Sequence, residues 1–149
     1  MSQSKNVVIV GGGAAGVATA RLLSPKLGAL GYNLILIDAR PFFVHLIGSI
    51  RMAVSAVDHL EELGKVILPY DNVFAHGVGV LKVGTVASVT ETAGAGGIVT
   101  LQDGERVPYE YLVLAPGALW SDHISFPNDH PCVSSPLPSH AHSHLPPDR

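Results

Sequence analysis

The chain contains short, unbroken apolar runs separated by stretches that carry most of its polar residues. The first run, residues 7–10, consists of valine and isoleucine, and a second run, of leucine and isoleucine, covers residues 34–37. A third apolar run covers residues 111–115 and is followed by a proline and a glycine. Runs this short, apolar at every position, are typical of parallel strands that are covered on both faces. The pattern therefore predicts three buried strands of a parallel sheet.

A glycine-rich turn and a helix separate the first two runs. Three consecutive glycines follow residue 10, and residues 14–23 are rich in alanine and leucine, which favour helices. Strand, helix and parallel strand within about thirty residues form a right-handed βαβ unit. Lys5 and the apolar residues 7–20 also resemble a signal peptide, but three glycines do not suit the helix of such a signal. We therefore favour the strand–turn–helix interpretation.

Beyond the second strand the pattern changes. We expect a loop at residues 41–43, a helix at residues 45–63 and a third strand at residues 78–83. Shorter strands separated by glycine-containing turns then predict an antiparallel meander, at residues 86–90, 98–101 and 106–109.

The composition changes again at residue 128. Residues 128–149 contain five prolines and four histidines, without apolar periodicity, which predicts a disordered tail. The expected fold is therefore α/β. A partial Rossmann-like domain, with a parallel sheet and an antiparallel β-meander, would cover residues 1–127.

Composition and charge exclude several classes of protein. Hydrophobic residues make up 47% of the chain and charged residues 14%, which favours a buried α/β sheet over a disordered chain. The net charge is −3 and the nine Lys and Arg are scattered, so nucleic acid is not an expected partner. Cys132 is the one cysteine, which excludes an internal disulfide. No apolar stretch is long enough to span a bilayer, and we expect a cytoplasmic location, with peripheral membrane attachment left open.

The turn after the first strand has the spacing Gly11-x-Gly13-x-x-Gly16, which in this context is the fingerprint of dinucleotide binding. Gly11 permits the sharp turn, Gly13 lets a pyrophosphate approach the backbone, and Gly16 lets the helix pack closely on the sheet. Free N–H groups at the helix start attract an anion, and the helix dipole adds about 0.3–1 kcal/mol. We therefore predict a pyrophosphate site that needs no cationic side chain.

Asp38 ends the second strand, where a carboxylate can accept hydrogen bonds from the 2′- and 3′-hydroxyls of an adenosine ribose. The same carboxylate would repel a 2′-phosphate, which argues against NADP in this site. The fingerprint does not choose between FAD and NAD. The meander, in place of a further crossover helix, favours FAD.

The order of these motifs resembles the pyridine-nucleotide-disulphide-oxidoreductase superfamily of FAD/NAD(P)-binding proteins. Within it, the chain is most similar to the apoptosis-inducing-factor-like, or ferroptosis-suppressor-like, NAD(P)H oxidoreductases. The matching segments are residues 7–16, 35–41, 46–54 and 109–117, followed by Phe126-Pro127.

The resemblance implies a set of contacts with FAD. The residues that would wrap its pyrophosphate are Gly11, Gly13, Ala14, Ala15 and Gly16. Asp38 would hold the adenosine ribose, Ala39 and Arg40 would flank the adenine, and the backbone of Val86 would pair with it.

The resemblance implies two further cofactor contacts, one at the turn of residues 115–117 and one at Arg51. Ala115 and Gly117 match an Ala-Thr-Gly turn near the cofactor, but Pro116 replaces its threonine and lacks a backbone N–H, which puts those contacts in doubt. Arg51 is either a charge-assisted donor to the pyrophosphate or a solvated helix cation.

The resemblance also bears on activity. Family members are well over twice as long, and after the first FAD segment they carry an NAD(P)H-binding domain that does not follow Gly117 here. We therefore expect a truncated FAD-dependent oxidoreductase of the NAD(P)H:quinone type that is inactive alone. The alternatives are a non-catalytic dinucleotide-binding fragment and an NAD-binding module that acts with a partner chain. NAD(P)H and quinone would be partners of a complete enzyme.

We predict neither a catalytic residue nor a metal site in this chain. His140, His142 and His144 have a spacing that could bind a transition metal weakly, but metal sites need ligands held by a fold. In a proline-rich tail these histidines and Cys132 are expected to be unstructured.

Replacement of Asp38 by alanine tests the ribose assignment. Asp38→Ala should markedly weaken binding of ADP or any adenine dinucleotide, because the hydroxyls of the ribose lose their acceptor. Isothermal titration calorimetry measures the change, and an unaltered affinity would remove Asp38 from the site.

Overall fold

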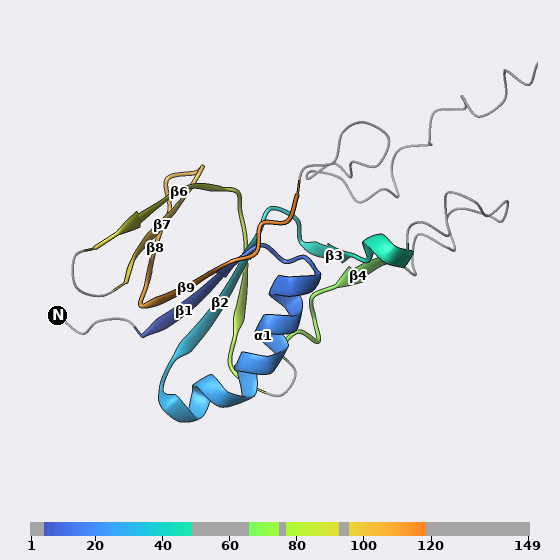
Figure 1. Ribbon diagram of the computed structural model, residues 1–149, viewed down its shortest axis with the longest axis horizontal. Helices are drawn as coiled ribbons and strands as arrows, with labels where there is room; N and C mark the ends of the chain where they lie inside the picture. Colours follow the sequence, from blue (N-terminus) through green and yellow to red (C-terminus); the bar gives the residue numbers. More distant parts are fainter. Residues whose placement is uncertain (1–4, 49–65, 75–76, 93–95, 119–149) are drawn as a thin grey trace, which may run out of the picture.

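The computed structural model describes residues 5–48, 66–74, 77–92 and 96–118 of the chain (Figure 1). Its elements are, in order, β1 (Asn6–Val10), α1 (Ala14–Leu27), a short 3₁₀ helix (Gly28–Leu30), β2 (Asn33–Asp38), β3 (Phe42–Val44), β4 (Ile67–Pro69), β5 (Val80–Val83), β6 (Val86–Glu91), β7 (Gly97–Leu101), β8 (Arg106–Tyr109) and β9 (Tyr111–Leu114).

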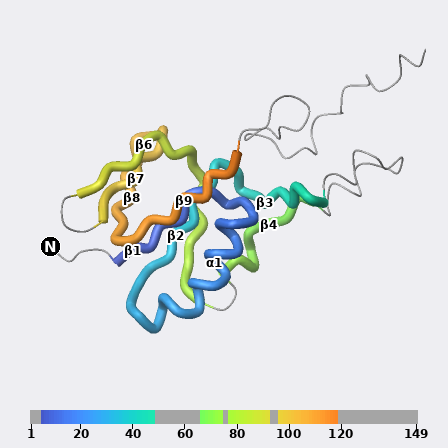
Figure 2. Tube along the Cα trace, viewed as in Figure 1, coloured from blue at the N-terminus to red at the C-terminus, as the bar shows by residue number. Residues whose placement is uncertain are grey.

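A four-stranded parallel sheet with the order β5-β2-β1-β9 forms the centre of the fold. Val8 of β1 pairs with Ile35 of β2 on one side and with Leu112 of β9 on the other. The trace in Figure 2 shows β9 beside β1 although about a hundred residues of sequence separate them. The predicted pairing of residues 7–10 with residues 34–37 is therefore confirmed, and so is the βαβ unit.

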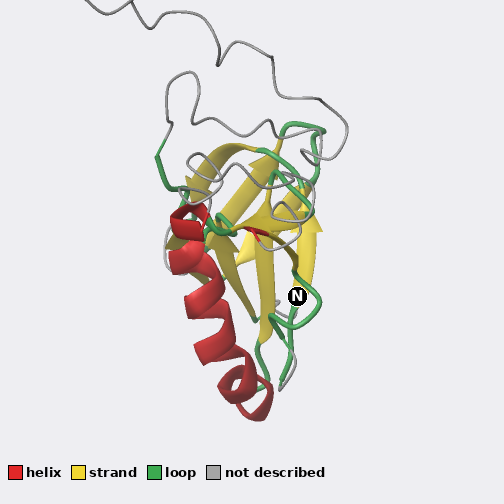
Figure 3. Ribbon diagram, turned by 90° about the vertical axis from the view of Figure 1, so that its right-hand side faces the viewer, coloured by secondary structure: helices red, strands yellow, loops and turns green. Residues whose placement is uncertain are grey.

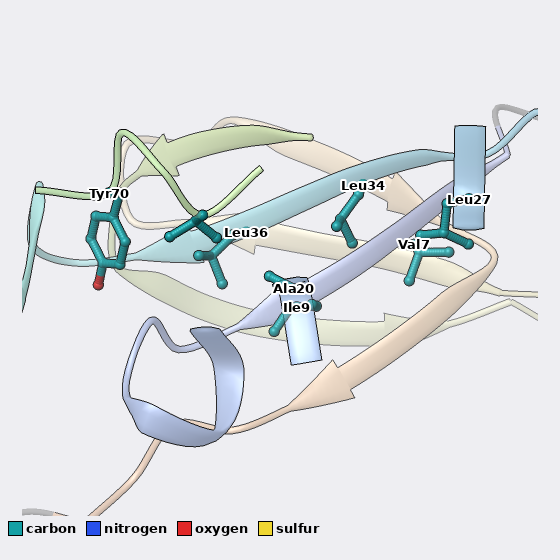
Figure 4. Packing of buried hydrophobic residues seen from close by; sticks show 8 residues of the cluster. Val7, Ile9, Ala20, Leu27, Leu34, Leu36 and Tyr70 are labelled. Carbon is teal, nitrogen blue, oxygen red and sulfur yellow. The ribbon is translucent and has the colours of Figure 1, made fainter. Parts of the chain in front are cut away.

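The parallel sheet is covered on both faces by different elements. On one face α1 packs against β1 and β2 (Figure 3), and the buried side chains there include Ile9, Ala20 and Leu36 (Figure 4). On the other face the antiparallel sheet β6-β7-β8 packs against Val8 and Ile37. The predicted meander is confirmed, and it forms the third layer of the domain.

Strand β9, expected from the apolar run at residues 111–115, is not buried as predicted. Tyr111 and Leu114 are 57% and 62% exposed, although the run looks as apolar as that of β1. In the described part of the chain β9 is an outer strand of the sheet, so part of its surface has no neighbour. An apolar run does not by itself distinguish a central strand from an edge strand.

The sequence predicted a helix over residues 14–23, with Ser24-Pro25 either ending it or starting one more turn. Helix α1 runs to Leu27 and includes Pro25, so the chain takes the additional turn. Tertiary hydrogen bonds hold the additional turn. The Ser24 hydroxyl donates to the carbonyl oxygen of Val78 at 2.8 Å, and the Val78 N–H donates to the carbonyl oxygen of Ser24 at 3.2 Å. These contacts offset the cost of a proline inside the helix.

Two further predictions were wrong in detail. Residues 41–43 were expected to be a loop, but Phe42 to Val44 form β3, which pairs with the unpredicted β4 in an antiparallel ribbon. Strands of three residues are too short to show an alternating pattern. The third strand begins at Val80 rather than at residue 78. Of the helix expected at residues 45–63, residues 46–48 are helical, His45 lies just before them, and residues 49–63 lie outside the described residues.

Gly16 permits the close approach of α1 to the end of β1. A Cβ atom at this position would collide with the carbonyl oxygen of Gly11 and lie 3.6 Å from the Ile9 side chain. This agrees with the role expected for Gly16 in helix–sheet packing.

Gly16→Ala should therefore lower the free energy of unfolding by about 1–3 kcal/mol, the usual cost of overpacking. Urea denaturation followed by circular dichroism measures the loss. Gly13→Ala is the matched control, since a Cβ at Gly13 has no atom within 4 Å. Equal destabilisation by both substitutions would contradict the packing argument.

Candidate functional site

The site is built around the turn that joins β1 to α1. Gly11 has a φ of +101°, a left-handed conformation that favours glycine, and a Cβ there would also collide with the carbonyl oxygen of Ala115. The Gly11 N–H donates to the carbonyl oxygen of Ile37 at 2.8 Å, which ties the turn to the end of β2. The turn therefore lies across the carboxyl ends of β9, β1 and β2.

The start of α1 presents backbone N–H groups to solvent. Gly13 is the N-cap residue in an extended conformation, no side chain caps the helix, and no acidic residue lies in its first turn. The first helical hydrogen bond runs from the Val17 N–H to the Gly13 carbonyl at 2.9 Å. The amides of Ala14, Ala15 and Gly16 precede it, and such amides lack acceptors within a helix. This arrangement attracts an anion such as a phosphate.

Asp38, at the end of β2, lies beside this turn. Its Oδ2 accepts a hydrogen bond from the Gly12 N–H at 2.5 Å, and its Oδ1 accepts one from the Arg40 N–H at 2.8 Å. The Arg40 Nε lies 4.0 Å from Oδ1. A carboxylate has about four acceptor positions, so these two hydrogen bonds leave acceptor capacity for the hydroxyls of a sugar.

A cavity of about 250 Å³ opens next to the turn. Gly12, Gly13 and Ala14 line one side of it, and the aromatic side chains of Phe42 and Phe43 line another. Ligand pockets measure roughly 300–1,000 Å³, so this cavity suits a part of a dinucleotide. Strand β3 in the wall differs from the loop that the sequence predicted at residues 41–43.

Tyr70 connects the cavity to the turn. Its hydroxyl donates to the carbonyl oxygen of Gly12 at 2.9 Å, and its ring belongs to the core beneath α1. Burial raises the pKa of the Tyr70 hydroxyl, and the nearby Asp38 carboxylate raises it further, against a smaller opposing effect of Arg40. The hydroxyl therefore stays a hydrogen-bond donor. No motif pointed to Tyr70, because its partner Gly12 is far away in the sequence.

The segment after β9 reaches the same place. The Ala115 N–H donates to the carbonyl oxygen of Val10 at 2.8 Å, and the Ala115 carbonyl faces Gly11. Gly117 has a φ of +75°, which explains a glycine there. The structure thus brings Ala115 next to the glycine-rich turn between β1 and α1.

The remaining residues expected at the site are less closely grouped. Ala39 and Arg40 are half-buried beside Asp38. The Gly84 N–H donates to the Asp38 carbonyl at 2.8 Å, which brings the start of β6 to this end of the sheet, while the Val86 side chain packs in the core under the meander. Arg51 lies outside the described residues.

A second perturbed group lies at the opposite end of the sheet. A hydrogen bond to Glu110 at 2.9 Å, helped by desolvation, raises the pKa of Tyr32 to about 12. Tyr32 precedes β2 and Glu110 precedes β9, so this pair is remote from the carboxyl ends of the strands.

The described ranges lack both a metal-binding cluster and a membrane-spanning helix. They contain no group of three or more histidine, cysteine, aspartate or glutamate side chains arranged to hold a metal ion. None of their helices has the length and apolar character needed to cross a membrane.

Comparison with known proteins agrees with this geometry. The pyridine nucleotide-disulphide oxidoreductase family model matches residues 5–141. The chain belongs to this family. Membership of the family supports FAD as the cofactor of the site.

Individual relatives bear out the narrower resemblance. Apoptosis-inducing factor homolog B of Dictyostelium discoideum is 32% identical over 78% of this chain and 26% of its own length. Apoptosis-inducing factor 1 of Saccharomyces cerevisiae is 34% identical over 81% of this chain and 29% of its own length. FAD-dependent oxidoreductase FVFD30 of Flammulina velutipes is 43% identical over 52% of this chain and 23% of its own length. The chain therefore spans about a quarter of the length of these relatives.

The fold also recurs in a solved structure. The sulfide:quinone oxidoreductase of Aquifex aeolicus superimposes with a TM-score of 0.59 and 24% identity, over 76% of this chain and 24% of that protein. This likeness supports the Rossmann-type fold.

Gly13→Ala tests the phosphate-binding turn. Because a Cβ at Gly13 would project into open space, the substitution should leave the melting temperature nearly unchanged. It should nevertheless weaken ADP binding about tenfold or more, because the methyl group would occupy the space through which a phosphate approaches the amides. Calorimetric titration and thermal melting measure the two effects, and unchanged ADP binding would place the phosphate elsewhere.

Proposed function

We propose that this chain binds FAD through the ADP half of the cofactor, as the cofactor-binding part of an FAD-dependent oxidoreductase. One observation carries the proposal: the Asp38 carboxylate accepts the Gly12 N–H at 2.5 Å, immediately before the helix start whose amides are open. An acceptor for a sugar and donors for a diphosphate are thus adjacent. In ADP the ribose is joined directly to the diphosphate, so its two groups match this arrangement.

The residues present fit this ligand. The pyrophosphate would be held by the backbone of the turn and helix start, at Gly11, Gly13, Ala14, Ala15 and Gly16. Asp38 would accept the ribose hydroxyls, with Ala39, Arg40 and the backbone of Val86 around the adenine. When bound, FAD supplies the capacity to accept a hydride and pass electrons on. The protein contributes orientation and the electrostatics of the site.

The reaction we propose for the whole oxidoreductase is electron transfer from NAD(P)H to a quinone. This step rests on the resemblance to the apoptosis-inducing-factor-like enzymes. For the 149-residue chain itself we propose cofactor binding without turnover. Hydride transfer needs a nicotinamide held against the flavin, whereas the residues of this proposal would hold the ADP half of FAD.

An absorption spectrum of the purified chain tests the proposal. We expect a flavin band after incubation with FAD and gel filtration, at close to one flavin per chain, and displacement of the flavin by excess ADP. Asp38→Ala and Gly13→Ala should each reduce the bound fraction. No NADH oxidation with a quinone is expected.

Other results would redirect the assignment. A colourless chain that binds neither ADP nor FAD would refute the proposed function. Binding of NAD with a higher affinity than FAD would favour a nicotinamide-binding module. Quinone-dependent NADH oxidation would show that the chain is catalytic by itself.

A further inference from the structure

Gly12 lies between two side-chain anchors, although the dinucleotide fingerprint assigns it no role. Its N–H donates to Asp38 Oδ2 at 2.5 Å, and its carbonyl oxygen accepts a hydrogen bond from the Tyr70 hydroxyl at 2.9 Å. Gly11 and Gly13 flank it. Glycine adopts many backbone conformations, so a run of three has little preference of its own. The two anchors therefore decide the orientation of both peptide groups around Gly12.

The Tyr70 hydrogen bond acts on the peptide group that joins Gly12 to Gly13. In a trans peptide the C=O and N–H bonds point in opposite directions. Holding the Gly12 carbonyl toward Tyr70 therefore directs the Gly13 N–H away from it. If this peptide group rotated by half a turn, a carbonyl oxygen would take the place of an N–H donor and repel an anion.

Tyr70 is itself held firmly. It is 5% exposed and belongs to the core cluster that includes Leu36 and Ile9, and Figure 4 shows it at one end of this cluster. A Cβ at Gly12 would collide with the Tyr70 hydroxyl and lie 3.0 Å from Asp38 Oδ2. Gly12 has no positive φ, so the contact with Tyr70, rather than backbone conformation, requires a glycine.

We propose that Tyr70 is a positioning residue for the diphosphate. Its hydroxyl fixes the peptide group between Gly12 and Gly13, so that the Gly13 N–H, immediately before α1, is oriented before the ligand arrives. Preorganisation of this kind increases affinity because the turn loses little freedom on binding. The inference rests on the proposed function for its ligand, but the orientation of the turn is a property of the free protein.

Tyr70→Phe tests the role because it removes the hydroxyl and keeps the ring. ADP should bind about two- to tenfold more weakly, the value of one neutral hydrogen bond. Adenosine, which has no phosphate, should bind with the same affinity to the wild-type chain and to Tyr70→Phe. The matched control is Tyr109→Phe: Tyr109 is also buried, and its hydroxyl donates to the Thr90 carbonyl at 3.4 Å in the distant meander. This control should leave ADP affinity unchanged.

A measurement without ligand separates this inference from the proposed function. In the free protein, nuclear magnetic resonance should show faster exchange of the Gly12 amide, which donates to Asp38, in Tyr70→Phe, and no change there in Tyr109→Phe. Unchanged exchange, or equal losses for ADP and adenosine, would overturn the positioning role. So would a Tyr70→Phe chain that fails to fold, because the hydroxyl would then serve stability. A wild-type chain that binds no ADP would refute the proposed function while the exchange data still decide the role of Tyr70.

Discussion

The start of α1 lies against the carboxyl ends of β1 and β9 because glycine, which has no side chain, occupies two positions of the contact. Gly16 faces the carbonyl oxygen of Gly11, and Gly11 faces the carbonyl oxygen of Ala115, with no room for a Cβ at either glycine. This close approach brings the amides of the helix start over the end of the sheet. Every other feature of the site is arranged around that backbone contact.

A second layer of interactions gives the turn a single orientation. Asp38 and Tyr70 hold Gly12 from the N–H and the carbonyl side, and the two residues come from β2 and from the segment after β4. Asp38 thus has two functions in our account: it orients the turn and it offers acceptor positions to a sugar. A short hydrogen bond between a carboxylate and a backbone amide is strong enough to orient the turn. It uses one acceptor position, so others stay available to the hydroxyls of the sugar.

Several features of the fold were predictable from local patterns. The runs at residues 7–10 and 34–37, with glycines and a helix between them, led directly to the parallel pair β1 and β2. The apolar residues 42–44 did not lead to β3, and Ser24-Pro25 left open whether α1 ends there or continues to the observed Leu27. In both places the deciding interaction is with a distant segment, β4 in one case and Val78 in the other.

The sequence by itself determined that the turn between β1 and α1 has the dinucleotide fingerprint. This was possible because the fingerprint lies within one βαβ unit, in the spacing of Gly11, Gly13 and Gly16 and in Asp38 at the end of the next strand. The sequence also determined the family to which the chain belongs. The tertiary structure alone decided that Tyr70 contacts Gly12 and that β9 lies at the edge of the sheet. Contacts across tens of residues depend on how the layers pack, and a single sequence carries no periodic signal for such pairs.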